Sequence, residues 1–156
     1  MIAVLQRADR AAVQVEGEVV GSIDKGLMIL LGVGVEDTVD DAECLAKKIA
    51  ACRIFRDEND KMNLSLLDVG GGALVISNFT LLADYSHGNR PSYFGAAAPQ
   101  QAEVLYDEFC RLLSARLSRE VAKGKFGAHM HIDMVADGPV TIVMDSRVLR
   151  PKGANA

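Results

Sequence analysis

The sequence predicts an α/β protein of the α+β type: a single domain in which a largely antiparallel or barrel-like sheet packs against two main helices. Three observations support this fold class. The 156 residues suit one domain, and the 49% that are apolar suffice for one core. Strand-like alternation occupies the first third and returns near the end. Two stretches between these regions repeat apolar residues at helical spacing. We place the domain at residues 1–146 and a basic tail, expected to be frayed, at 147–156.

The first third of the chain is expected to form strands. Apolar and polar residues alternate from Ala12 to Glu16, Gly17 marks a turn, and the strand pattern resumes from Val19 to Ile23. A nearly continuous apolar run from Leu27 to Val33 is typical of a buried strand. We interpret these three segments as an antiparallel meander.

The next segment has the features of a helix. Thr38 is a suitable N-cap with Asp41 three residues on, and the apolar residues that follow recur at helical spacing, which predicts a helix to about Cys52. After a polar turn and three glycines at 70–72, the mostly apolar segment Ala73–Thr80 predicts another strand.

A long loop and a second helix are expected in the following third. Residues 84–95 are small or polar and lack periodicity, which is typical of a loop. Pro99 suits the first turn of a helix, and an apolar stripe at helical spacing extends it to about Leu117.

Two strands are predicted near the end of the chain. His129–Val135 alternates, with Met130, Ile132 and Met134 on the expected core face, and Val140–Met144 resembles a partner strand. The intervening Asp137-Gly138-Pro139 is rich in turn-forming residues, so a hairpin turn is the simplest interpretation there.

Composition narrows the function classes. No apolar run reaches the roughly 20 residues that cross a bilayer, and the first ten residues do not resemble a signal peptide, so we expect a cytoplasmic protein without a membrane partner. The three cysteines, Cys44, Cys52 and Cys110, form no CxxC pair and are expected to be reduced thiols. A net charge of -4 gives no global attraction to nucleic acid, so any RNA contact must come from local basic residues.

Ser77-Asn78-Phe79-Thr80 is the first candidate site. At the end of an apolar strand, such side chains often only satisfy local backbone groups. The functional alternative is a hydrolase site in which backbone N–H groups, released from the sheet, stabilise an oxyanion. Thr80 as a nucleophile is a weaker hypothesis, because no histidine lies nearby in sequence to act as its base.

Gly138-Pro139 is the second candidate. A turn is sufficient to explain it, yet an X–Pro bond costs little to hold cis, and a cis bond would direct two neighbouring carbonyls the same way. Two such acceptors could hold an ammonium group and measure the handedness of an amino acid.

Two further sets of polar residues have less specific patterns. His129, His131 and Asp133 project from one side of a predicted strand, which is weak evidence for a metal site. His87 and Arg90 lie in the long loop, where RNA or substrate contact and simple solvation are both compatible with the sequence.

Over nearly the whole chain, from Met1 to about Ser146, the sequence resembles the bacterial-type D-aminoacyl-tRNA deacylases. The similarity lies in the shared order and spacing of many short stretches, each weak alone. These include Leu5-Gln6-Arg7, Gly17 to Gly21, Gly26-Leu27, Leu31 to Val33, Asp37-Thr38, Arg53 to Phe55, Lys61 to Asn63, Phe79 to Leu81, Ala83-Asp84, Gly88 to Ser92, Lys125 to Ala128 and Asp137 to Thr141.

The resemblance implies a homodimer that hydrolyses the ester bond of D-aminoacyl-tRNA. Gly138-Pro139, with a cis peptide, would enter the partner subunit's site, hold the substrate's α-amino group and leave no room for an L side chain. Glycine has no side chain to be excluded, so glycyl-tRNA mischarged on tRNA-Ala is an expected second substrate. The partners implied are the 3′ end of aminoacyl-tRNA and a second copy of the chain, with no DNA.

The resemblance also implies where the chemistry occurs. Backbone N–H groups near Phe79 and Thr80, within the Ser77–Thr80 segment, would form the oxyanion site, and the 2′-hydroxyl of the terminal ribose would help to activate water. Arg7 is expected to brace Gly138-Pro139. Neither a cofactor nor a metal is required.

Two positions depart from the family pattern. Asn78 stands where the family usually has Gln, and Ala136 where it usually has Asn two residues before Gly-Pro. Ala136 therefore raises an alternative hypothesis, a catalytically weakened relative that binds aminoacyl-tRNA. A third hypothesis is a metal-dependent hydrolase that uses His129 and His131.

Overall fold

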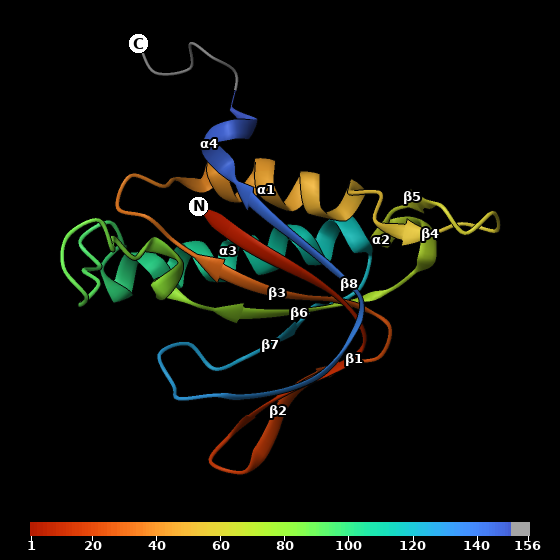
Figure 1. The fold of residues 1–156 in the computed structure, drawn as a ribbon, viewed down its shortest axis with the longest axis horizontal. Helices are drawn as coiled ribbons and strands as arrows, with labels where there is room; N and C mark the ends of the chain where they lie inside the picture. Colours follow the sequence, from red (N-terminus) through yellow and green to blue (C-terminus); the bar gives the residue numbers. More distant parts are fainter. Residues whose placement is uncertain (151–156) are drawn as a thin grey trace.

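Strand β1 (Ile2–Val15) is the central element of the sheet in this computed structural model, which describes residues 1–150 (Figure 1). Its first half pairs with β3 (Gly26–Gly32) and its second half with β2 (Glu18–Ile23), both antiparallel. Both β2 and β3 therefore neighbour β1, and the predicted meander is wrong. The reason is that β1 is long enough to hold two partners in succession along one edge.

The sheet continues from β3 through β6 (Gly72–Ser77) to β7 (Ala122–Lys123), and these two added pairings are parallel. A Cβ built on Gly21 of β2 would lie 2.4 Å from the carbonyl oxygen of Lys123 in β7, so the ends of the strand order approach closely. The sheet is therefore nearly closed, and the predicted α+β fold with a largely antiparallel, barrel-like sheet is confirmed.

Two long helices and several short elements complete the fold (Figure 1). Helix α1 (Val39–Ala51) begins after Thr38, and α3 (Pro99–Leu117) begins at Pro99, as the sequence predicted. The short elements are β4 (Phe55–Arg56), β5 (Met62–Leu64), α2 (Leu66–Val69), the 3-10 helix η1 (Phe79–Leu82) and α4 (Ser146–Leu149). No helix in residues 1–150 combines the length and the apolarity needed to span a bilayer.

Apolar side chains fill both sides of the sheet. The larger core joins one face of β1, β3 and β6 to α1 and α3, for example through Ile29, Leu45 and Phe109. The smaller core, on the opposite face, includes Leu74 and Ile76 of β6. Because both faces of β6 are covered, its sequence is a continuous apolar run rather than an alternation.

Strand β8 (His131–Asp145) differs from the predicted hairpin. Its two halves do not pair with each other, and both lie antiparallel on β1. Asp137-Gly138-Pro139 therefore interrupts one strand instead of reversing the chain, because turn-forming residues also suit a bulge. The predicted core face is also partly wrong: Met130 and Met134 pack against the smaller core, but Ile132 is 41% exposed.

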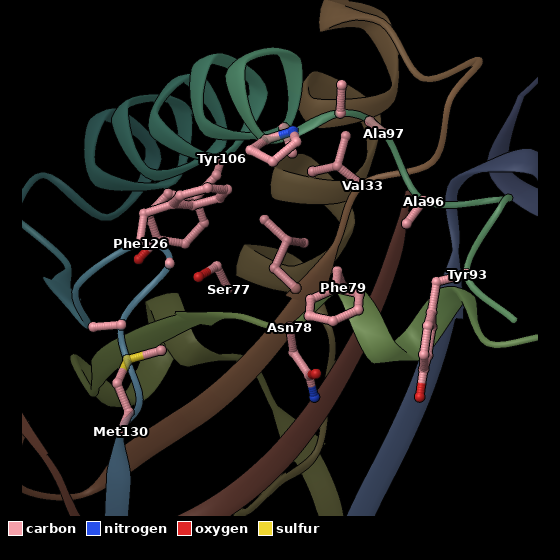
Figure 2. A pocket seen from close by; sticks show the side chains of 16 residues that line it. Val33, Ser77, Asn78, Phe79, Tyr93, Ala96, Ala97, Tyr106, Phe126 and Met130 are labelled. Carbon is pink, nitrogen blue, oxygen red and sulfur yellow. The ribbon is translucent and has the colours of Figure 1, made fainter. Parts of the chain in front are cut away.

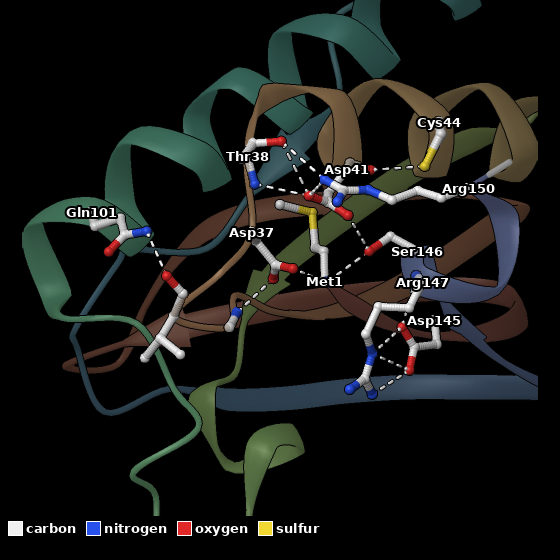
Figure 3. A network of polar contacts seen from close by, with 12 residues as sticks. Met1, Asp37, Thr38, Asp41, Cys44, Gln101, Asp145, Ser146, Arg147 and Arg150 are labelled. Atoms are coloured by element: carbon white, nitrogen blue, oxygen red, sulfur yellow. Dashed lines mark hydrogen bonds and ion pairs between the residues drawn. The ribbon is translucent and has the colours of Figure 1, made fainter. Parts of the chain in front are cut away.

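A polar network ties the start of β1 to α1 and α4 (Figure 3). The Met1 α-ammonium donates to Asp37 (2.5 Å) and to the Ser146 hydroxyl (2.8 Å). Ser146 in turn donates to the buried carboxylate of Asp41 (2.7 Å), which also binds Arg150. Residues 147–149, at the start of the predicted tail, belong to α4, and 151–156 lie outside the described residues, so the frayed tail stays a prediction.

Asp41→Asn is expected to lower the free energy of unfolding by about 2 kcal/mol at pH 7, because it removes the counter-charge of half-buried Arg150 and weakens the hydrogen bond that buried Ser146 donates. Burial raises the pKa of Asp41, but the backbone N–H of Thr38, Ser146, Arg150 and the α-ammonium together lower it below 3.8. The carboxylate therefore stabilises the fold above that pH, and the contribution is lost as the pH falls toward the folded-state pKa.

Urea denaturation of wild type and variant at pH 7 and at pH 3 measures this difference. The exposed Asp40→Asn is the matched control, since Asp40 occupies the same helix turn without these partners. An Asp41→Asn deficit that equals the control, or one that does not shrink at pH 3, contradicts the prediction.

Candidate active site

A cavity of about 630 Å³ opens between the end of β6, the start of α3 and the loop that precedes β8 (Figure 2). Its walls are mostly apolar. The lining residues are Leu31, Val33, Ser77, Asn78, Phe79, Tyr93, Ala96, Ala97, Ala98, Pro99, Ala102, Tyr106, Phe126, Gly127, Ala128 and Met130. In the described part of the chain, no acid, histidine, lysine, arginine or cysteine lines this cavity. General acid–base chemistry by a charged side chain is therefore not built into its walls.

The floor of the cavity is the point where β6 ends. The Asn78 N–H makes the last bond to the sheet, to the Leu31 carbonyl (2.8 Å), and the chain then turns into η1. Because Phe79 and Thr80 are the first residues of that 3-10 helix, their N–H groups have no partner within it. Among residues 1–150, neither N–H donates to any other group.

The predicted segment Ser77–Thr80 is thus divided by the structure. Ser77, Asn78 and Phe79 line the cavity, whereas Thr80 does not. The Thr80 hydroxyl donates to the Asn78 side-chain oxygen (2.5 Å), an amide that cannot act as a base. This contact argues against Thr80 as a nucleophile and leaves its main chain available.

Aromatic rings form two walls of the cavity, and three of the four rings, those of Tyr93, Tyr106 and Phe126, were not assigned to the site by sequence reasoning. Phe79 contacts Tyr93 edge to face, with ring centroids 5.1 Å apart. Across the cavity Tyr106 lies 5.8 Å from Phe126, and the Tyr106 hydroxyl donates to the Val75 carbonyl (2.7 Å). The only signals for these positions were short matches to the family pattern around residues 92 and 126, which named no role.

Burial keeps the nearby ionisable groups neutral. It raises the pKa of the Tyr106 phenol far above its ordinary value, with a further contribution from neighbouring Cys110. Burial likewise raises the pKa of the Cys110 thiol to about 12, and all three cysteines are free, as expected. Neither group is an activated nucleophile at neutral pH.

Gly138-Pro139 lies outside this cavity. The peptide bond between them is cis, as anticipated, and both residues are exposed. Between the pairs Gln6–Thr141 and Ala8–Ala136, β1 advances two residues while β8 advances five, so β8 carries three extra residues. The Gly-Pro segment therefore protrudes from the sheet.

Arg7 lies beneath this protrusion. Its side chain is 2% exposed and forms an ion pair with Asp137 (2.9 Å), the residue before Gly138. It also donates to the main-chain oxygens of Asp137 (3.3 Å) and Ile54 (2.7 Å). Ala136 contributes main-chain pairing with Ala8. Arg7 thus holds the chain next to Gly138-Pro139, in the position where a brace is predicted.

The other sequence candidates do not join the cavity. His129 and His131 contact each other edge to face, with centroids 5.0 Å apart, while Asp133 binds Arg10 instead (3.3 Å). Within residues 1–150, no three histidine, cysteine or acidic side chains gather as a metal site would require. His87 and Arg90 are exposed in the loop.

Comparisons with known proteins agree with this architecture. Residues 4–145 match the family model described as D-Tyr-tRNA(Tyr) deacylase. The chain is 56% identical over 150 residues to a D-aminoacyl-tRNA deacylase of Chloroflexus aurantiacus, covering 96% of this chain and 93% of that protein. It is 51% identical over 147 residues to the Koribacter versatilis enzyme of the same name, covering 94% and 98%.

A solved structure has the same fold. The c-Myc DNA unwinding element binding protein superposes with a TM-score of 0.87 at 38% sequence identity, over 93% of this chain and 98% of that one. The family match spans β1 to the end of β8 and so includes both the cavity and the protruding Gly-Pro segment. The resemblance seen in the sequence is therefore confirmed, and the chain belongs to the D-aminoacyl-tRNA deacylase family.

Proposed function

We propose that this chain hydrolyses the ester bond of D-aminoacyl-tRNA, releasing the free D-amino acid and tRNA. The observation that carries the proposal is the end of β6, where Phe79 lines an uncharged cavity and, within residues 1–150, the N–H groups of Phe79 and of the next residue, Thr80, have no partner, in a chain of the deacylase family. The substrate exists where translation occurs, so we expect the protein to act in the cytoplasm.

The chemistry needs little from the side chains. Water attacks the ester carbonyl, the two N–H groups stabilise the oxyanion, and the ribose oxygen leaves with a proton as the tetrahedral intermediate collapses. We assign activation of the water to the neighbouring 2′-hydroxyl of the substrate's terminal ribose. An already reactive ester, correctly positioned beside these donors, requires no stronger base.

The selectivity for D-amino acids is assigned to Gly138-Pro139 of a partner subunit. Within residues 1–150 the cavity receives nothing from 131–145 of its own chain, while the Gly-Pro segment protrudes into solvent. The main-chain oxygens of the partner's segment would hold the substrate's α-amino group and exclude an L side chain. Glycine lacks that side chain, so glycyl-tRNA mischarged on tRNA-Ala is a second substrate.

The outer edge of β8 supports the homodimer that this gate requires. In the described residues β8 pairs with β1 alone, which leaves one edge of a long strand unpaired. Ile132, Val135 and Val143 are exposed along it, at 41%, 41% and 68%. Long apolar edge strands are seldom left uncovered, and a second copy would cover this one.

The proposal is tested with purified protein and three substrates: D-Tyr-tRNA, L-Tyr-tRNA and Gly-tRNA-Ala. Loss of the ester from the first and third, with the second preserved, is the expected result. Binding of D-Tyr-tRNA without hydrolysis would instead support the weakened relative suggested by Ala136. Size-exclusion chromatography with light scattering reports the dimer, and a strictly monomeric active enzyme would contradict the cross-subunit gate.

A further inference from the structure

We infer that Gln6 and Asp137 are positioning residues that clamp the two ends of the Gly138-Pro139 protrusion. The inference rests on the proposed function, because the position of this segment matters for selectivity only if it enters a partner's site. It assigns a role to two side chains that neither the chemistry above nor the family match specifies.

The entrance to the protrusion is held through Asp137. Arg7 is almost fully buried, and a buried guanidinium is costly unless a counter-charge lies beside it. Within residues 1–150, Asp137 is the one carboxylate at ion-pair distance from Arg7 (2.9 Å). Because Arg7 is itself fixed by the Ile54 carbonyl (2.7 Å), the ion pair anchors the residue before Gly138 to a rigid point.

The exit from the protrusion is held through Gln6. The Thr141 hydroxyl donates to the Gln6 side-chain oxygen (2.6 Å), and the Gln6 amide nitrogen donates to the Val140 carbonyl (3.4 Å). Gln6 and Arg7 are consecutive on β1, so their side chains leave opposite faces of the sheet. The protrusion is therefore held from both faces, once at each end.

Main-chain pairing cannot replace this clamp. The β1–β8 ladder stops at Ala8–Ala136 and resumes at Gln6–Thr141, so ladder pairs position none of the residues between them. Ala136 has no polar side chain with which to hold the segment. The side-chain contacts of Gln6 and Asp137 therefore carry the positioning that position 136 does not supply.

The test compares Gln6→Met, Thr141→Val and the double variant for kcat/KM on D-Tyr-tRNA and L-Tyr-tRNA. Thr141→Val is expected to lower the D-to-L ratio about fivefold, the effect of one hydrogen bond, and Gln6→Met at least as much, because it also removes the bond to the Val140 carbonyl. The double variant should be no worse than the more affected single one, because both remove the same contact. Gln14→Met is the matched control, a half-buried glutamine of β1 paired with His131, away from the protrusion.

Asp137→Asn tests the other end, with Asp133→Asn as its control on the same strand. The Asp137 variant should reduce the ratio, and Asp137→Glu should partly restore it, which a purely structural loss would not show. If Asp137→Asn fails to fold, the Gln6 series decides, since Gln6 is only half-buried.

Hydrogen–deuterium exchange provides a readout independent of activity. The amides of Gly138, Val140 and Thr141 should exchange faster in Gln6→Met than in wild type or Gln14→Met. Folded Gln6→Met with unchanged exchange and an unchanged D-to-L ratio overturns the inference. Wild-type protein that leaves D-Tyr-tRNA intact overturns the proposed function instead, so the two failures are distinguishable.

Discussion

Phe79→Pro is expected to lower kcat for D-Tyr-tRNA about 100- to 1000-fold while KM stays within about twofold, the loss typical of removing one oxyanion donor. Proline deletes the Phe79 N–H, which in residues 1–150 donates to no protein group, so no structural hydrogen bond is lost. The first residue of a 3-10 helix has a φ that proline adopts. Asn78, with ψ 89°, is not in the helical conformation that a following proline disfavours.

Phe79→Leu separates the N–H from the ring. It removes the edge contact with Tyr93 but keeps the donor, so kcat should fall by less than about tenfold. Single-turnover kinetics on both variants, with circular dichroism to confirm folding, make the comparison. Equal activity of the proline and leucine variants would place the oxyanion site elsewhere.

Gly138→Ala is expected to reduce the ratio of D- to L-Tyr-tRNA hydrolysis by about 10- to 100-fold, because the segment must leave its present conformation. Gly138 has φ +131°, which residues with a side chain rarely adopt, and an added Cβ would lie 2.6 Å from the Val140 nitrogen. A displaced protrusion presents its main-chain oxygens in the wrong place, and misplacement of about 1 Å can cost about 100-fold.

Gly17→Ala is the control for backbone strain. Gly17 also has positive φ (+82°), but a Cβ there meets nothing within 4 Å, and its turn follows the end of β1, away from the Gln6–Ala8 stretch that faces the protrusion. Initial rates on both substrates, measured beside melting temperatures, distinguish a local effect from general destabilisation. An equal fall of the D-to-L ratio in Gly138→Ala and Gly17→Ala would contradict a specific role of Gly138 in selectivity.

Local chemistry was sufficient to predict the helices. Thr38 with Asp41 predicts the start of α1, and the Thr38 N–H does donate to the Asp41 carboxylate (2.8 Å). Pro99 begins α3 for a similarly local reason, since its missing N–H would have no partner there. Signals of this kind require no knowledge of distant residues.

Pairing between distant segments was not predictable. Whether Gly138-Pro139 forms a turn or a bulge depends on β1, more than 120 residues away, which pairs with both halves of β8. The cavity likewise combines Phe79, Tyr106 and Phe126 from three elements, and only the first lay in a predicted site. The structure places Ser77, Asn78 and Phe79 at the cavity, whereas their catalytic roles remain predictions.

Hydrogen-bond donors of the main chain place different constraints on sequence evolution than catalytic side chains do. Every amino acid except proline carries the same N–H, so residues 78–80 can drift in evolution without erasing the function, provided that the strand still ends at Ser77. On the proposed function, Asn78 in place of the family's usual glutamine is expected to be a tolerated change of this kind. Divergent sequences can thus share one chemistry because natural selection acts there on the path of the backbone.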